Sequence, residues 1–225
     1  MITSNLLDAR SQLHVVIVPH PDDEVLGFGG LISRLVREGN QVHVIIVFGR
    51  NTARGQQQQK DAFTVQKVLG YTELTVLNLD SNCDTRNLVS IIENRILQII
   101  NLHGPIDGIW TVGPGDNHQD HAKLFSAITA AMRPAFMKNV HAIYAGEVIS
   151  SADQAVGAIR CQFIPNTYIV LTMKDLDCKI ETMSIYTGEA SITRNSDHIT
   201  TYAKKRGGEA NAIYAEAFML LRSIE

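Results

Sequence analysis

Short runs of apolar, largely β-branched residues, each followed by a longer stretch with helical spacing, constrain the fold of this chain most. The runs are LHVVIVP, VHVIIVF, ELTVLNL and GIWTV, and turn residues bound them. Continuous apolar runs suit parallel strands that are covered on both faces. The alternation therefore predicts an α/β fold over about the first 145 residues, a Rossmann-like, doubly wound, mostly parallel sheet with helices on both faces.

The rest of the chain is expected to form a later region of the sheet, with further helices. VHAIYAGEV, FIPNTYIVL and AEAFMLLRS are predicted strands, and helices are expected around 175–186 and 197–206. The chain has 225 residues, of which 45% are hydrophobic and 19% charged, and this length suits one large α/β domain better than two small ones. We therefore expect residues 1–225 to form a single domain. The polar segment 49–61, GRNTARGQQQQKD, is expected to be a mobile loop that runs into a helix.

The composition argues against several classes of partner. The formal net charge is −3 and basic residues are scattered, so neither nucleic acid nor a membrane is an expected partner. The N-terminus has no basic leader, and HVVIV is too short for a signal peptide or a membrane span. Cys83, Cys161 and Cys178 form no CxxC motif and are expected to be reduced, buried thiols. We expect a cytoplasmic protein that acts on a small molecule, as a monomer or as a homo-oligomer.

Two clusters of histidine and carboxylate residues follow predicted strands. HPDDE, residues 20–24, follows the first strand, and GPGDNHQDH, residues 113–121, follows GIWTV and leads into an expected helix, HAKLFSAITAAMR. Doubly wound sheets bind ligands beyond the carboxyl ends of their strands. Adjacent carboxylates resist burial unless a positive group lies among them. We therefore expect the two clusters to meet around a metal ion.

The spacing within the clusters indicates three ligands. Catalytic zinc takes three protein ligands from histidine and carboxylate and keeps a fourth position for water. His20 and Asp23 are three residues apart, which at a helix start brings both side chains to one side. His121 is the expected third ligand, since it ends a Gly/Pro-rich segment at a helix start. Zn²⁺ is the expected cofactor, and Fe²⁺ suits the same ligands.

Three further residues of the clusters are candidates for catalysis. A carboxylate beside the metal can take a proton from bound water, so Asp22 is the expected general base. His118, held in one tautomer by Asp120, is expected to donate to the oxyanion that forms when water attacks a carbonyl carbon. Asp22, His118 and Asp120 are thus the expected catalytic residues, and the constellation is typical of a hydrolase.

Simpler roles exist for the same residue types. Asp22 or Asp23 can cap a helix that begins near Glu24. Histidines near strands are commonly structural, and we expect that role for His14, His43, His103, His141 and His198. Capping does not require two histidines that flank an aspartate at a second strand end, and the second cluster therefore favours the metal.

The motifs resemble a known family. HPDDE, HxDH, GYTELTVLNLD and RGGEANAIYAEAF together resemble the PIG-L/LmbE-like zinc-dependent de-N-acetylases over most of the chain. The resemblance implies an N-deacetylase that removes an acyl group, most often acetyl, from an N-acetylglucosamine-type conjugate by attack of zinc-bound water. It assigns the same roles as the spacing does to His20, Asp22, Asp23, His118 and His121.

The chain departs from the family pattern in places. Gln119 stands where the family usually has proline. Arg54 is followed by Gln57, where the family commonly has a glutamate three residues after the arginine. Arg54 remains a candidate for substrate binding, as does Glu147, which resembles a frequent family glutamate.

Two other functions stay open. A two-metal phosphoesterase also uses Asp and His at strand ends, with ions about 3.5–4 Å apart, and Asp80 and Asp116 would be its extra ligands. A non-catalytic sugar-binding protein could share the fold, although it has no use for Asp22 beside an open metal position. The conjugate is also open, since thiol-cofactor precursors, antibiotic intermediates, glycans, lipid-linked sugars and nucleotide sugars all fit this centre.

Overall fold

One sheet of seven strands runs through the part of the chain that the computed structural model describes, residues 11–133, 138–149, 151, 163–189 and 191–224. The strands are β1 (Leu13–Val18), β2 (Gln41–Phe48), β3 (Glu73–Leu79), β4 (Ile106–Val112), β5 (Val140–Gly146), β6 (Thr167–Leu171) and β7 (Tyr214–Ser223). Their order is β3-β2-β1-β4-β5-β7-β6. β1 to β5 pair in parallel, whereas β7 is antiparallel to β5 and β6. The predicted mostly parallel α/β fold is confirmed.

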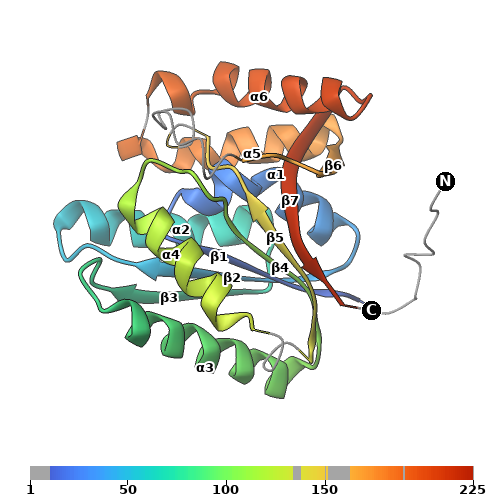
Figure 1. Cartoon of the computed structure of the whole chain (residues 1–225). Helices are drawn as coiled ribbons and strands as arrows, with labels where there is room; N and C mark the ends of the chain where they lie inside the picture. The colour runs from blue at the N-terminus through green and yellow to red at the C-terminus, as the bar shows by residue number, and fades with distance from the viewer. Residues whose placement is uncertain (1–10, 134–137, 150, 152–162, 190, 225) are drawn as a thin grey trace.

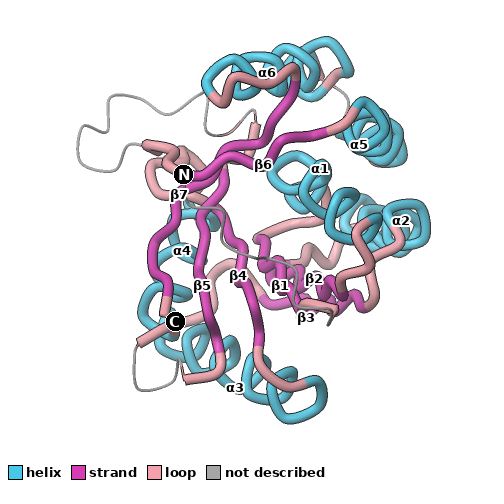
Figure 2. Tube along the Cα trace, turned by 90° about the vertical axis from the view of Figure 1, so that its right-hand side faces the viewer, coloured by secondary structure: helices cyan, strands magenta, loops and turns pink. Residues whose placement is uncertain are grey.

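Helices cover both faces of the sheet (Figure 1, Figure 2). They are α1 (Asp23–Arg37), α2 (Ala53–Leu69), α3 (Thr85–His103), α4 (Gln119–Ala131), α5 (Met173–Ile185) and α6 (Ser196–Glu209). α1, α2 and α5 pack together on one face, and α6 lies beyond α5 against β7. α3 and α4 pack together on the other face. Two short 3-10 helices, Thr187–Glu189 and Ile192–Arg194, lie between α5 and α6.

The apolar runs form the core because parallel strands beneath two helical layers have no solvent-facing side. All six residues of β1 are buried, and β2 exposes only Gln41. Phe28 of α1 stacks on Phe218 of β7, with ring centroids 5.9 Å apart. Because β1 and β4 are buried in this core, their carboxyl ends are held in fixed positions. The two clusters of histidine and carboxylate residues directly follow these ends.

The segment 49–61 runs into a helix as predicted, but the helix takes up most of the segment and the loop before it is short. α2 begins at Ala53, and Thr52 caps it by accepting the backbone N–H of Gly55 at 3.1 Å. Glutamine has a favourable helix propensity, so the run of four glutamines supports the helix. α2 buries few residues, and hydropathy alone therefore does not reveal it.

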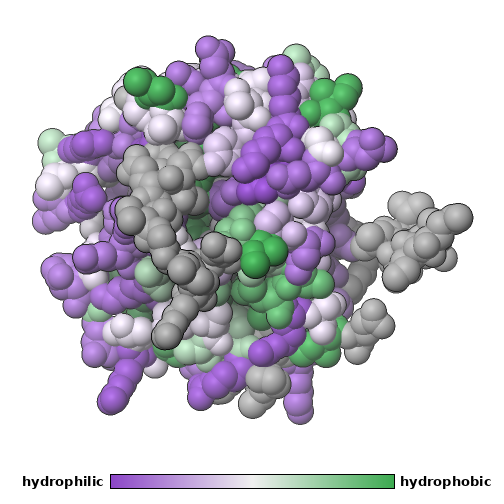
Figure 3. Space-filling view, turned by 45° about the horizontal axis from the view of Figure 1, so that its top comes forward, coloured by the Kyte–Doolittle hydropathy of each residue, from purple (hydrophilic) through white to green (hydrophobic). Residues whose placement is uncertain are grey.

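The surface is mostly hydrophilic on the face shown in Figure 3, with apolar residues in small groups. No helix in the described part of the chain is long and apolar enough to cross a membrane.

Cys83 and Cys178 are free thiols that are only partly buried, so the prediction that they are fully buried was wrong for these two. Cys161 lies outside the described residues.

Buried His14 is expected to make stability depend on pH. His14 accepts the indole N–H of Trp110 on Nδ1 at 3.2 Å, and burial lowers its pKa to about 4, with partial opposition from Asp107. In the unfolded state His14 takes up a proton near its ordinary pKa of 6.5. The contribution of neutral His14 to the free energy of unfolding is therefore fully present above that pH. It falls as the pH drops from about 6.5 to about 4, by about 3 kcal/mol in all.

Chemical denaturation of the wild type and of His14→Gln checks this prediction. Glutamine retains an acceptor for Trp110 but does not titrate, so every other group contributes equally to both proteins. Between pH 7 and pH 4 the wild type should lose about 3 kcal/mol more unfolding free energy than the variant. Parallel losses in the two proteins would exclude His14 as the cause.

Candidate metal centre

The two clusters meet where the order of the sheet reverses. β1 and β4 are neighbours, but the chain continues from β1 to β2 on one side and from β4 to β5 on the other. Such a switch point leaves a crevice at the carboxyl ends of the strands. Residues of both clusters line one cavity of ≈ 100 Å³ at this point, together with residues of α2 and of the 3-10 helices.

His20, Asp23 and His121 converge at this cavity. Oδ2 of Asp23 lies 3.3 Å from Nδ1 of His20 and 3.3 Å from Nε2 of His121. Ligand atoms of a tetrahedral zinc ion, with bonds of about 2.0–2.1 Å, lie about 3.3–3.4 Å from one another. Both contacts to Asp23 thus have the spacing of a zinc site.

The outer nitrogen of each histidine contacts a carboxylate. Nε2 of His20 lies 2.8 Å from Oδ2 of Asp120, and Nδ1 of His121 lies 2.7 Å from Oδ2 of Asp116. Burial opposes protonation, yet Asp120 and Asp23 raise the pKa of His20 to about 9, and Asp23 and Asp116 raise that of His121 to about 10. The same concentration of negative charge suits a divalent cation, and outer carboxylates commonly orient metal-binding histidines. The residues present therefore fit zinc.

Neither aspartate of HPDDE caps the helix that follows. Asp22 occupies the N-cap position of α1 without a side-chain capping bond. Oδ2 of Asp23 accepts the backbone N–H of His20 at 2.9 Å. Asp22 has a φ of 102°, which is rare for a residue other than glycine. Backbone strain of this kind concentrates at functional sites, so the capping explanation does not account for these residues.

Asp22 pairs with an arginine that no sequence motif marks. Nη1 of Arg194 donates to Oδ2 of Asp22 at 2.6 Å and lies 2.7 Å from Oε2 of Glu189. Glu189 also pairs with Arg54. Burial and the charge of Asp23 raise the pKa of Asp22 well above its usual range, and Arg194 opposes them. Arg194 thereby favours the carboxylate form that a general base needs.

His118 lies at the start of α4, with its ring centroid 4.8 Å from that of His20 and 4.9 Å from that of His121. Its Nδ1 accepts the backbone N–H of Asp120 at 3.2 Å, so a neutral ring carries its proton on Nε2. Burial, His20 and His121 lower the pKa of His118. A neutral ring with a fixed donor suits oxyanion stabilisation.

The partner that fixes His118 differs from the predicted one. The sequence suggested the carboxylate of Asp120, whereas the structure uses the backbone N–H of that residue. The carboxylate of Asp120 contacts His20 and accepts the hydroxyl of Ser81 at 2.8 Å. Asp120 is therefore a positioning residue for His20. Ligand atoms of His20, His118 and His121 all lie within 4.8 Å of one another, so His118 borders the metal centre.

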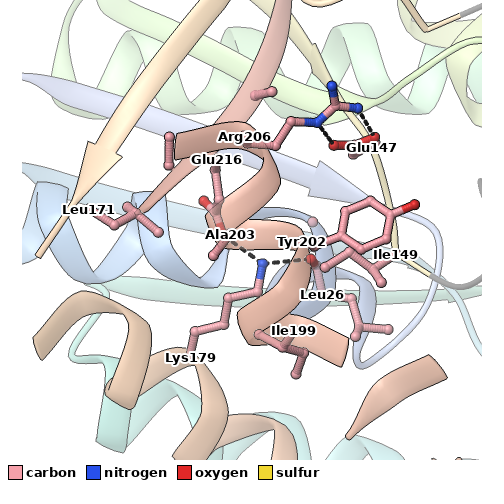
Figure 4. A pocket seen from close by; sticks show the side chains of 13 residues that line it. Leu26, Glu147, Ile149, Leu171, Lys179, Ile199, Tyr202, Ala203, Arg206 and Glu216 are labelled. Carbon is pink, nitrogen blue, oxygen red and sulfur yellow. Dashed lines mark hydrogen bonds and ion pairs between the residues drawn. The ribbon is translucent and has the colours of Figure 1, made fainter. Parts of the chain in front are cut away.

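Only one of the two substrate-binding candidates lies at this cavity. Arg54 lines it and donates from Nε to Oε1 of Glu189 at 3.1 Å. Glu147 instead accepts two hydrogen bonds from Arg206, both at 2.6 Å. Figure 4 shows this pair in another pocket, which also holds the ion pair of Lys179 with Glu216. The structure does not bring Glu147 to the metal centre.

The extra ligands proposed for a two-metal site lie elsewhere. Asp116 contacts the far side of His121 and accepts the hydroxyl of Ser151 at 2.7 Å. Asp80 is exposed and accepts the backbone N–H of Asn82 at 2.7 Å. Two-metal catalysis needs carboxylates placed to hold both ions. Neither aspartate is so placed, which weakens the phosphoesterase alternative.

Comparison with known sequences places both clusters inside one family match. The model of the PIG-L family, GlcNAc-PI de-N-acetylase, matches residues 15–132. The protein named "Uncharacterized deacetylase YaiS" from Escherichia coli (strain K12) is 27% identical over 127 residues, which cover 53% of this chain and 67% of that protein.

Solved structures share the fold over nearly the whole chain. The N,N'-diacetylchitobiose deacetylase from Pyrococcus horikoshii has a TM-score of 0.71 at 17% identity, covering 95% of this chain and 85% of that chain. A zinc-inhibited form of the teicoplanin deacetylase Orf2 has a TM-score of 0.75 at 17% identity, with coverages of 93% and 97%. GalB, the 4-carboxy-2-hydroxymuconate hydratase from Pseudomonas putida KT2440, has a TM-score of 0.70 at 16% identity, with coverages of 95% and 98%. At these identities the likeness shows the fold alone, and the fold also supports a hydratase.

Proposed function

The chain belongs to the PIG-L family of de-N-acetylases, and from this premise we propose that it is a zinc-dependent hydrolase that removes an acetyl group from an N-acetylglucosamine-type conjugate. The observation that carries the proposal is the convergence of His20, Asp23 and His121 at the cavity, with a carboxylate behind each histidine. Asp22 and His118 line the same cavity. The residues that we propose as ligands, base and oxyanion donor thus line one cavity.

Each of the residues around the cavity has a separate role in the proposed hydrolysis of the amide. A zinc ion held by the three ligands would polarise the amide carbonyl and lower the pKa of a water molecule to about 7. Asp22 accepts a proton from the attacking water, and Arg194 holds its carboxylate in place. His118 donates from Nε2 to the carbonyl oxygen as that atom gains negative charge. The proton on Asp22 then passes to the amine as the C–N bond breaks, which releases acetate and a free amine.

The rim of the cavity supports a sugar conjugate as the substrate. Arg50, Arg54 and Arg194 line the cavity, together with Gln58 and Gln59. Guanidinium and amide groups hydrogen-bond hydroxyl, carbonyl and anionic groups. We propose that Arg54 binds a hydroxyl or acidic group of the conjugate, since it lies on the exposed side of this rim with its side chain 59% exposed.

Product analysis on a panel of N-acetylglucosamine conjugates tests the proposed function. The panel contains a thiol-cofactor precursor, a glycan fragment, a lipid-linked sugar and a nucleotide sugar, each assayed for acetate, free amine and newly formed phosphomonoesters. We expect acetate and amine in equal amounts from at least one member. Phosphomonoesters without acetate would support the phosphoesterase, and binding without any product would support the sugar-binding protein.

A further inference from the structure

A second group of side chains that could bind a metal lies at the opposite end of the strands from the first cavity. His43 is near the start of β2, Glu73 begins β3, and His103 ends α3. The first cavity follows the carboxyl ends of the strands, whereas these residues lie toward the amino ends of β2 and β3. Their candidate ligand atoms all lie within 4.8 Å of one another. We propose that His43, Glu73 and His103 form a second site for a zinc-like transition metal, with water as the fourth ligand.

The register of the sheet places two of these side chains together. His43 and Glu73 are partners in the parallel pairing of β2 with β3, so both side chains project from the same face. Oε2 of Glu73 lies 3.5 Å from Nδ1 of His43 and 4.0 Å from Nε2 of His103. The spacing in a tetrahedral zinc site is about 3.3–3.4 Å. The first distance nearly matches it, and a movement of His103 by under about 1 Å brings the second into range.

The environment of His43 points independently to a ligand. The residue is 1% exposed, yet neither ring nitrogen has a hydrogen-bond partner among the described residues. Buried polar atoms are nearly always paired, because an unpaired one loses its hydration without compensation. The structural role expected for His43 does not explain this arrangement. Burial also lowers the pKa of His43, which leaves a neutral ring with a lone pair for a metal.

Access suits such an ion, and the surrounding charges act in both directions: the Glu73 carboxylate favours a cation, whereas the nearby guanidinium of Arg95 opposes one. Arg95 donates to Oε1 of Glu73 at 2.6 Å, which leaves Oε2 to the two histidines. His103 ends α3, where the helix dipole favours a cation. The side chains of Glu73 and His103 are 41% and 33% exposed, so metal and water can enter. Two imidazoles favour zinc-like ions over calcium or magnesium, which prefer oxygen ligands.

The alternative is a contact between two rings without a metal. The rings of His43 and His103 meet edge to face, with centroids 4.7 Å apart and an interplanar angle of 88°. Such a contact needs neither Glu73 nor zinc. Zinc binding and its dependence on Glu73 therefore distinguish the two explanations.

Zinc binding to full-length His121→Ala protein tests the proposal, because the first site is disabled in that background. Equilibrium dialysis against zinc should leave about one ion per chain, and zinc at 100 times its Kd should raise Tm by about 5–10 °C. Adding His103→Ala should abolish both effects. Glu73→Gln, which retains the size of the side chain, should weaken binding at least about tenfold. Adding His141→Ala is the control, since His141 is an exposed histidine at the start of β5, and this change should alter neither effect.

Two outcomes would overturn the second site. His121→Ala protein that binds no zinc would leave only the ring contact, and equal zinc binding with and without His103→Ala would place the ion elsewhere. Circular dichroism verifies that each variant is folded, and Glu73→Gln offers a second test that leaves both histidines in place. Acetate release by the wild type is measured separately, so failure of the second site leaves the proposed deacetylase unaffected.

Discussion

Replacing His121 with alanine is expected to remove the metal of the active site and nearly all turnover. His121 is buried and is one of the three residues that we propose as metal ligands, with its Nε2 3.3 Å from Asp23. Loss of one oxyanion donor alone costs about 10²–10³ in kcat. Loss of the metal should cost more, and we expect acetate release to fall by more than about 10³-fold.

Metal content by mass spectrometry checks this expectation. The measurement is made in the His103→Ala background, so that the count reports only the first site. His118→Ala is the matched control, because His118 lies at the start of the same helix but is not one of the three assigned ligands. That control should retain about one zinc ion per chain. If His121→Ala also retained its ion, His121 would not be a ligand.

Replacing Asp22 with asparagine is expected to separate catalysis from metal binding. In the wild type, Arg194 donates to Asp22 at 2.6 Å. Asparagine retains an oxygen that can accept this hydrogen bond, but it cannot take a proton from water. We expect kcat to fall by about 10²–10⁴, while KM and zinc content stay near those of the wild type. Steady-state kinetics and metal analysis on the same preparation measure both quantities.

Two results would remove the role given to Asp22. Full activity in Asp22→Asn would show that another group takes the proton. Loss of zinc in parallel with activity would make Asp22 a ligand rather than a base. Asp120→Asn provides a comparison, because Asp120 acts through His20 and its loss should weaken zinc affinity by about 10–100-fold.

The fold and the centre of the site could be predicted because both depend on local patterns. Buried parallel strands must be apolar along their whole length, and β1 and β2 are. The switch point follows from the strand order, so HPDDE and HQDH were expected at one edge before any contact was known. The spacing of His20 and Asp23 within one turn likewise follows from local geometry.

The surroundings of the site could not be predicted because packing between distant segments determines them. Arg194 reaches Asp22 across 172 positions of the chain, and its segment, SITRNSD, carries no motif. Glu147 forms an ion pair with Arg206, 59 positions away in the chain. The likeness of Glu147 to a frequent glutamate of the family does not indicate this pair. The choice between the backbone N–H and the carboxylate of Asp120 likewise depends on loop conformation rather than on residue type.

The second site changes how metal stoichiometry is interpreted. Two ions per chain would ordinarily favour a two-metal phosphoesterase, whose ions lie about 3.5–4 Å apart. Here a count of two ions per chain is expected from two separate sites, one at the carboxyl ends of the strands and one at the amino ends. Loss of one ion in His103→Ala without loss of acetate release would show that the second ion is not needed for catalysis.

Acetate release through a cycle of metal removal and return tests the proposed function most directly. The purified protein is assayed as isolated, after chelation and dialysis, and after zinc is added back, with the conjugate that gives acetate in the panel. A zinc-dependent deacetylase loses activity on chelation and regains it with zinc, and His103→Ala behaves in the same way with a single equivalent. Acetate release that persists in the metal-free protein would contradict a role for His20, Asp23 and His121 as ligands of a catalytic metal.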